Sequence, residues 1–162
     1  MAMGKRIATL FELLIALTLF ALFAGMVITT HSNNAIISHT EEFVEMTRYK
    51  GCITEETYKA FLDGFDSVVD VRIQVDRKDV LGGPDALDST EFTQDVVNTI
   101  ASDPDGIYRM KVGDEITVIV RRPAGNLYNT IIGRLSGMKA QGGSPVIAIK
   151  GGMILNEQYV GA

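Results

Sequence analysis

The stretch TLFELLIALTLFALFAGMV, residues 9–27, decides how the rest of the chain must be organised. It lies within an apolar run from Ile7 to Ile28 that holds one charged residue, Glu12. At about 1.5 Å per residue, a helix of that length spans roughly 33 Å, which is enough to cross a bilayer. The alternative is a buried core helix, but a chain of 162 residues has little room to cover a helix that is apolar on every side. The sequence therefore predicts a transmembrane anchor.

The basic residues around this run predict its orientation. Lys5 and Arg6 precede it, whereas no Lys or Arg follows until Arg48. The positive-inside rule then places the amino terminus in the cytoplasm and residues 29–162 outside, in a single-pass protein of the cell membrane or in an extracellular filament. A cleaved secretory signal is the competing interpretation, but its apolar region is usually only about 7 to 15 residues long. We therefore expect the segment to be retained.

Composition limits what the outer part can be. Residues 1–28 carry a net charge of +1, so the remainder of a chain with a formal net charge of −5 carries −6. An acidic domain does not suit nucleic acid, and we expect no nucleic-acid partner. Cys52 is the only cysteine, so an internal disulfide is impossible and a hydrophobic core must hold the domain. We expect Cys52 to be a small buried residue in that core.

The segment after the span continues a helical pattern. No Gly or Pro interrupts residues 26–50, and Ile37, Phe43 and Val44 recur at helical spacing among polar residues. We expect this amphipathic half to pack on the outer domain and to end at Gly51. The chain then divides into 1–28, a cytoplasmic stub with a transmembrane or filament-core helix; 29–50, its amphipathic continuation; and 51–162, an exposed domain.

Residues 51–162 mix helical and strand patterns. Thr54 is a suitable N-cap for a helix, and residues 69–76 alternate apolar and polar side chains as a half-buried strand does. The predicted elements are a helix whose buried face is Tyr58, Phe61, Leu62 and Phe65; the strand; a loop at 79–89; a helix at 90–102 through Phe92, Val96, Val97 and Ile100; a strand or hairpin after the Gly113-Asp114 turn; a short helix at 126–137; and a strand at 144–157 with a further strand beyond Gly151-Gly152. We therefore predict an α+β fold with an antiparallel or mixed sheet.

Residue types that carry chemistry are sparse. His31 and His39 lie about 80° apart around a helix, so they do not form an i, i+4 metal pair. We interpret the nearby acids Glu41, Glu42 and Glu45 as a solvated helix face. The basic pairs Arg77-Lys78 and Arg121-Arg122 are interpreted as solvated strand ends, with a phosphate or partner site as the alternative. Three glycine pairs are interpreted as turns, namely Gly82-Gly83, Gly142-Gly143 and Gly151-Gly152. No nucleophile, base and oxyanion site come together, so we expect no enzyme, metal or cofactor.

The stretch ATLFELLIAL, residues 8–17, resembles the amino-terminal helix of type IV pilins and pseudopilins, whose pattern is Phe-Thr-Leu-Ile-Glu-Leu-Leu-Ile. Thr9, Leu10 and Glu12 match that pattern, Phe11 replaces an Ile, and Ala8 stands where the family's mature first residue would be. In the family a peptidase cuts after a Gly at the preceding position, which is Ile7 here. The outer domain, through YRMKVGD and KGGMILNE, is similar to a poorly characterised family of small anchored proteins associated with pilus-like and conjugation-type gene clusters in Gram-positive bacteria.

The resemblance implies how the helix would be used. In pilins the glutamate pairs with the amine of a neighbouring subunit, so Glu12 is the first candidate assembly residue, with Lys5, Arg6 or an uncut amino terminus as its partner. Thr9 would add a polar contact, and Ala21 with Gly25 would form a small-xxx-small pair that lets helices approach. The expected partners are other copies of the chain, membrane lipid, and pilus or secretion machinery.

Two functions follow from these features. The first is a structural subunit of a pilin-like extracellular filament, assembled through the amino-terminal helix. The alternative is a monomeric, single-pass accessory protein of a pilus, secretion or conjugation apparatus.

The predicted orientation can be tested on intact cells. Because Lys5 and Arg6 hold the amino terminus inside, protease added outside should remove the carboxyl-terminal domain while a cytoplasmic marker stays whole. Immunoblotting with a carboxyl-terminal tag measures the loss. A tag that survives until the cells are lysed would show that the orientation is reversed.

Overall fold

The computed structural model describes residues 2–65, 68–78, 89–122 and 145–157, without the side chains of residues 2–7. The described residues separate into two compact units with a boundary between Asn34 and Ala35. The first, the helical unit, contains the helical residues up to Asn34. The second, the α+β unit, contains the described residues from Ala35 onward.

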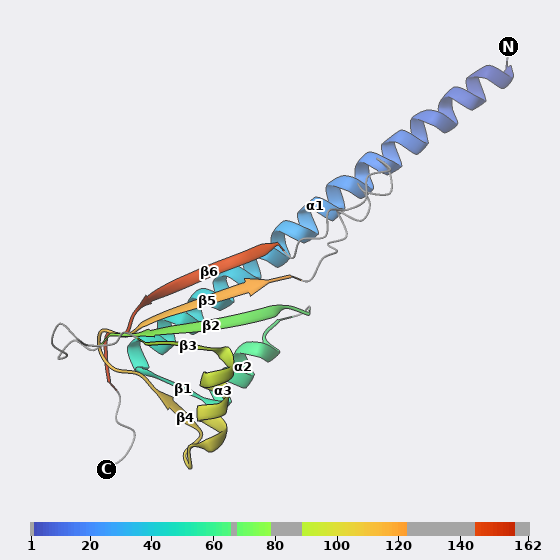
Figure 1. Cartoon of the computed structure of the whole chain (residues 1–162). Helices are drawn as coiled ribbons and strands as arrows, with labels where there is room; N and C mark the ends of the chain where they lie inside the picture. The colour runs from blue at the N-terminus through green and yellow to red at the C-terminus, as the bar shows by residue number, and fades with distance from the viewer. Residues whose placement is uncertain (1, 66–67, 79–88, 123–144, 158–162) are drawn as a thin grey trace. The chain divides into compact units, whose positions relative to one another are not determined.

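Helix α1 spans Ala2–Lys50, so the uninterrupted helix predicted for residues 26–50 is confirmed (Figure 1). It ends at Gly51, whose φ of +66° is a conformation that residues with a Cβ rarely adopt. The Gly51 N–H donates to the Thr47 carbonyl at 2.8 Å, which satisfies one of the last helical carbonyls. A Cβ at this position would also lie 2.0 Å from the Asn156 carbonyl oxygen. Both the positive φ and the close approach of Asn156 therefore require glycine at position 51.

The α+β unit contains two antiparallel sheets, which confirms the predicted fold class. The larger has the strand order β3-β2-β5-β6, and the smaller pairs β1 with β4. After α1 the elements are β1 Cys52–Thr54, α2 Glu55–Asp63, β2 Asp70–Arg77, β3 Ser89–Phe92, α3 Thr93–Ser102, β4 Ile107–Arg109, β5 Glu115–Arg121 and β6 Val146–Met153 (Figure 1). Thr54 caps α2 as expected, because its hydroxyl accepts the Thr57 N–H at 3.1 Å.

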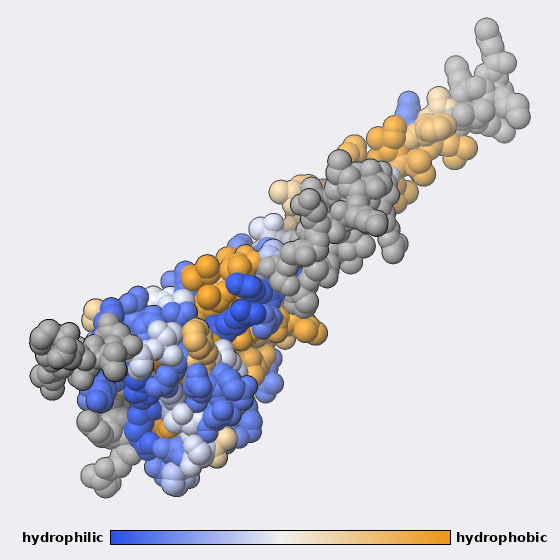
Figure 2. Space-filling view, in the orientation of Figure 1, coloured by the Kyte–Doolittle hydropathy of each residue, from blue (hydrophilic) through white to orange (hydrophobic). Residues whose placement is uncertain are grey.

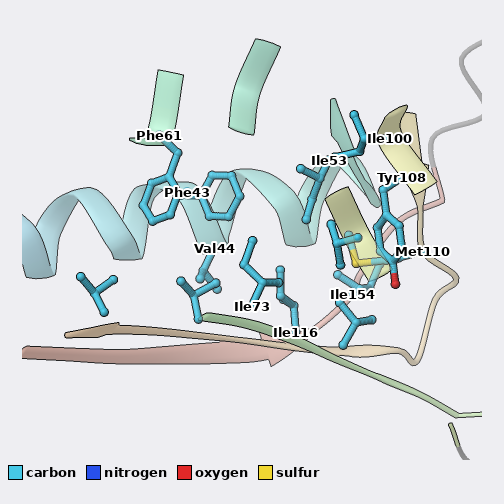
Figure 3. Close-up of a cluster of buried hydrophobic side chains, with 14 of the residues drawn as sticks. Phe43, Val44, Ile53, Phe61, Ile73, Ile100, Tyr108, Met110, Ile116 and Ile154 are labelled. Atoms are coloured by element: carbon cyan, nitrogen blue, oxygen red, sulfur yellow. The ribbon is translucent and has the colours of Figure 1, made fainter. Parts of the chain in front are cut away.

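The core lies on both sides of the carboxyl-terminal half of α1. Figure 3 shows Val44 directed toward the strands that carry Ile73 and Ile116, and Phe43 directed toward Phe61 of α2. The Phe43 and Phe61 rings stack with centroids 4.1 Å apart. On the sheet side, β5 buries every second residue, and these are Ile116, Val118 and Val120. This part of α1 is therefore a central layer between α2 and the larger sheet.

Polar contacts fix the direction in which α1 and β6 run. Lys150 Nζ lies 2.8 Å from Glu41 Oε2, and farther along both elements Arg48 Nε donates to the Met153 carbonyl at 3.0 Å. The Leu155 N–H donates a hydrogen bond to the Arg48 carbonyl at 3.0 Å. Exposed ion pairs contribute little stability, so their main effect is to set the register of β6 along the helix.

The prediction of a turn at Gly151-Gly152 is wrong, because β6 runs straight through both residues. A Cβ at Gly152 would lie 2.6 Å from Arg48 Nε, and one at Gly151 would lie 2.7 Å from the Ile116 carbonyl oxygen. Glycine inside a strand often marks such a close approach. The two glycines therefore allow β6 to pack closely against α1 and β5, and the chain does not change direction at them.

Three smaller expectations are also corrected. Phe92 belongs to β3 and is 57% exposed, because Asp95 accepts its N–H at 2.8 Å and the helix begins at Thr93. Leu62 is 38% exposed, so Phe61 is the fully buried residue of the α2 face. Strand β4 pairs with β1, so it does not form a hairpin with β5.

Some expectations lie outside the described residues. These are the loop at 79–88, the short helix at 126–137, and the turns at Gly82-Gly83 and Gly142-Gly143. Ser89, the last residue of the predicted loop, is the first residue of β3.

The central position of α1 makes Val44 a sensitive site. Replacing Val44, which is 2% exposed, by Asp buries a charge against the sheet and should lower the free energy of unfolding by about 3 kcal/mol or more. Urea unfolding of the full chain in detergent, followed by circular dichroism, measures the change. The control Ser38→Asp adds the same charge at an exposed position of this helix and should shift stability by less than about 0.5 kcal/mol. Equal midpoints for the two variants would contradict the layered core.

The two glycines of β6 should respond differently to alanine. Gly151→Ala meets a backbone carbonyl that cannot move freely, so we expect a loss of about 1 to 3 kcal/mol. Gly152→Ala meets only the Arg48 side chain, which can swing away at the cost of about one hydrogen bond, near 1 kcal/mol. The same urea experiment ranks the two variants. A larger loss for Gly152→Ala would refute this explanation of the pair.

Candidate membrane and assembly surface

The helical unit exposes a continuous apolar surface. From Leu10 to Ile28 its large apolar side chains, apart from the partly buried Leu22, are each at least 50% exposed, and Figure 2 shows one face of this apolar segment. The exposed set is Leu10, Phe11, Leu13, Leu14, Ile15, Leu17, Leu19, Phe20, Phe23, Met26, Val27 and Ile28. So large an apolar surface marks a site of contact with lipid or with other proteins.

Length and composition make α1 one candidate membrane-crossing helix among the described residues. Only 6% of its most apolar 18-residue window is buried, which sets it apart from the core helix of a soluble protein. The predicted apolar helix is therefore present, and its surface is not covered by the described core. Its topology in a membrane stays a prediction.

Two hydroxyls on this helix are satisfied within it. Thr18 Oγ1 donates to the Leu14 carbonyl and Thr29 Oγ1 donates to the Gly25 carbonyl, each at 2.8 Å. In hydrocarbon every polar donor needs such a partner, because no water is present to replace it. These threonines can therefore face lipid without an unpaired donor.

Glu12 and Thr9 lie three residues apart, so they share one face of α1 near its start, and both are exposed. Among the side chains that the structure describes, no cation lies within 4.0 Å of the Glu12 carboxylate. The side chains of Lys5 and Arg6 are outside the described residues, so their pairing with Glu12 stays a prediction. Glu12 is thus a carboxylate on an apolar surface with no described internal partner.

Ala21 and Gly25 lie four residues apart and therefore also share a face. Ala21 is exposed. Gly25 itself is buried, and an added Cβ would meet no atom of the described residues within 4 Å. No close approach within the described part of the chain therefore requires glycine at this position.

His39 packs between α1 and α2. His39 stacks on Phe61 with ring centroids 5.4 Å apart and meets the edge of Phe65, and its Nε2 donates to the Phe61 carbonyl at 3.1 Å. A Cβ at Gly64 would lie 2.1 Å from that nitrogen. His39 is therefore a packing residue between α1 and α2, and among the described residues no three His, Cys, Asp or Glu side chains are grouped to hold a metal.

A polar cluster that sequence reasoning missed links the two sheets. Tyr108 of β4 donates its hydroxyl to Glu91 of β3 at 2.7 Å, and the Arg77 guanidinium of β2 pairs with Glu91 and lies 5.3 Å from the Tyr108 ring centroid. Burial, together with the hydrogen bond to Glu91, raises the pKa of Tyr108 well above its ordinary value. Arg77 is thus a half-buried structural cation and not the solvated strand end that we predicted. The cluster joins residues that are far apart in the sequence, so no local sequence pattern could have predicted it.

Two further features of the α+β unit, a cysteine and a polar hollow, lie among the described residues. Cys52 is buried as expected, and burial raises the pKa of its thiol, which is the opposite of an activated nucleophile. An open hollow at the start of α2 is lined by Glu55, Glu56, Lys59, Asp63 and Asp105, among others. The hydrogen bond from Lys59 lowers the pKa of Glu55, as in an ordinary surface ion pair. Neither feature assembles a reactive group.

Comparisons with known proteins give no match, whether with family models, with curated proteins or with solved structures. The resemblance to pilins therefore depends on residues 8–17 and on the architecture, which is a long apolar helix packed on a small antiparallel α+β unit.

Proposed function

We propose that this chain is a structural subunit of a pilin-like extracellular filament, inserted in the membrane and assembled through its amino-terminal helix. The observation that carries the proposal is the extensive apolar surface that α1 exposes between Leu10 and Ile28. The packing of the other half of α1 on an antiparallel sheet is compatible with a pilin-like architecture. Both features describe a helix whose two halves need different surroundings.

Lipid alone can cover this surface, so association needs a further source of specificity. Between helices in a bilayer there is no hydrophobic driving force, and close packing with polar contacts must supply it. Ala21 and Gly25 offer the close approach, because a glycine and an alanine on one face leave room for a neighbouring backbone. Thr9 and Glu12 offer polar contacts on an apolar surface. These four residues are the proposed assembly residues of the span.

Glu12 has the sharpest proposed role. A carboxylate near the bilayer centre costs about 2.5 to 3.5 kcal/mol on insertion scales and less near an interface, so it is expected to find a partner. In a filament, Lys5, Arg6 or the amino terminus of a neighbouring subunit would neutralise it and thereby set the axial register of one helix against the next. The alternative is a carboxylate that reaches headgroup water, since it lies only about 7 to 8 Å along the helix from Ile7.

A second candidate is a monomeric anchored accessory protein of a pilus, secretion or conjugation apparatus. It is favoured by the completeness of the core of the α+β unit, where Ile53, Tyr108 and Ile154 are fully buried by the chain itself. A unit of this kind can present a surface to a partner without any second copy. Electron microscopy of shed material separates the two candidates, because only the first predicts regular fibres of this single chain.

The substitution Glu12→Gln tests the assembly role. It keeps the size of the side chain and removes the charge, so the number of fibres should fall at least tenfold, about 1.4 kcal/mol or more per contact, if an ion pair sets the register. Fibres counted by electron microscopy and chain found in the membrane fraction are the two measurements.

Membrane insertion should not fall, because the variant is less polar than the parent. Glu55→Gln, at an exposed position of α2, is the matched control and should leave fibre number unchanged. If Glu12→Gln gives fibres of normal number and length, the register role of Glu12 is contradicted, and the interpretation that its carboxylate reaches headgroup water remains. If the unsubstituted chain itself forms no fibres, that result would favour the accessory-protein function.

A further inference from the structure

The two edges of the larger sheet differ in how well they are protected. Strand β3 forms one edge and has four residues, whereas β6 forms the other edge and has eight (Figure 1). Natural sheets keep their edges from pairing with other chains by short edge strands, by charged side chains or by covering the edge. The only charged residue of β6 is Lys150, and its ammonium group pairs with Glu41 of α1. The edge formed by β6 therefore lacks the protection that a short or charged strand gives.

Hydrogen bonds at the end of β6 show which of its residues direct their backbone groups away from the sheet. The Ile154 N–H donates to the carbonyl of Asp114, directly before β5, at 2.8 Å. In an antiparallel pair, residues that bond to the neighbouring strand alternate with residues that face away from it. The pairing of β6 with β5 is regular back to Ala148. Met153, Gly151 and Ile149 therefore direct their backbone groups outward.

Helix α1 covers one part of this edge and leaves the rest open. Arg48 Nε donates to the Met153 carbonyl at 3.0 Å, so the outward carbonyl of Met153 has a partner. The outward groups of Ile149 and Gly151 have no hydrogen-bond partner among the described residues. The Ile149 side chain is also 61% exposed. We call Ile149, Lys150 and Gly151 the open edge.

We propose that two copies of this chain pair antiparallel along the open edge, so that their larger sheets join into one. A two-fold pairing uses the same surface of both copies, so this surface must be complementary to itself. Two chains with a net charge of −5 each repel one another, but the charge of Lys150 at the open edge is matched by that of Glu41. Charge therefore does not oppose contact at this edge.

The side chains of β6 select one register for the pairing. A two-fold axis at Ile149 places the exposed Ile149 side chains of the two copies side by side, and it places Lys150 opposite Ala148. An axis at Lys150 would bring two like charges directly opposite each other. An axis at Gly151 would pair Ile149 with Met153, whose carbonyl already has a partner. The axis at Ile149 avoids both conflicts.

The full chain in detergent micelles tests this pairing without any fibre, so the test does not depend on the proposed filament. Residues opposite each other in a hydrogen-bonded antiparallel pair have Cα atoms about 5.5 Å apart, which a disulfide can span. Ile149→Cys should therefore link two copies under copper-catalysed air oxidation about tenfold faster, or more, than Ser89→Cys at the β3 edge. The parent chain should form no link, because Cys52 is buried. Non-reducing gel electrophoresis measures the rates.

A charge at the two-fold axis should prevent the pairing. Ile149→Lys puts like charges directly opposite each other, so the dissociation constant of the dimer should rise about tenfold or more. The fold should survive, because lysine is common on natural edge strands. Phe92→Lys makes the same change at the β3 edge, where the side chain is 57% exposed, and should leave the constant unchanged. Sedimentation in density-matched detergent measures the constant, and circular dichroism checks the fold.

Three results would overturn the pairing. A parent chain that stays monomeric at every concentration would exclude a second copy at the open edge. Equal linkage of Ile149→Cys and Ser89→Cys, or a dimer that Ile149→Lys does not weaken, would show that the copies meet through another surface. If Ile149→Lys unfolds the chain, the linkage rates at residues 149 and 89 decide alone.

Discussion

The two-sided packing of α1 between Ala35 and Lys50 is the constraint on which the α+β unit depends. The larger sheet and helix α2 each have an apolar face, and each face is covered by this one helix, through Val44 on one side and Phe43 on the other. Complete burial of such a side chain contributes about 1.5 to 3 kcal/mol, so both contacts matter in a unit without a disulfide. The buried hydroxyls of Thr40 and Thr47 donate to carbonyls one turn earlier in α1, at 2.7 and 2.8 Å, and therefore add no unpaired donor to the core.

The same helix changes character at the boundary between the units. From Leu10 to Ile28 most of its large apolar side chains are exposed, whereas from Ile36 to Met46 the large apolar residues are buried or partly buried in the core. Glu41 and Glu45 occupy the remaining surface and pair with Lys150 and Arg48. A continuous backbone thus joins a segment whose large apolar side chains are mostly exposed to a segment whose large apolar side chains mostly lie in the core. This contrast, more than length, makes the first segment a candidate for lipid or for other copies of the chain.

Local patterns predicted much of this fold. The helix to Lys50, its stop at Gly51, the cap at Thr54 and the alternating strands β2 and β5 each depend on neighbouring residues, so the sequence contains their signals. The glycine pair in β6 and the Arg77 cluster could not be predicted in the same way. Their causes are contacts with residues distant in the chain, namely Arg48, Ile116, Glu91 and Tyr108. For the candidate site, composition predicted the apolar surface, but the partner of Glu12 is not among the described side chains.

Two glycines inside regular elements differ in whether contacts within the chain explain why glycine stands there. Gly152 has a reason within the chain, because a Cβ there would collide with Arg48. Gly25 has none among the described contacts, since no described atom lies within 4 Å of an added Cβ, and yet glycine in a helix interior costs about 1 kcal/mol relative to alanine. In the filament proposed above, where helices attract one another by close packing, the small residues Ala21 and Gly25 would let a neighbouring backbone approach. The larger side chains one turn away on the same side, Leu17 and Ile28, would hold two helices apart, so a partner helix that used this face would have one favourable place to cross.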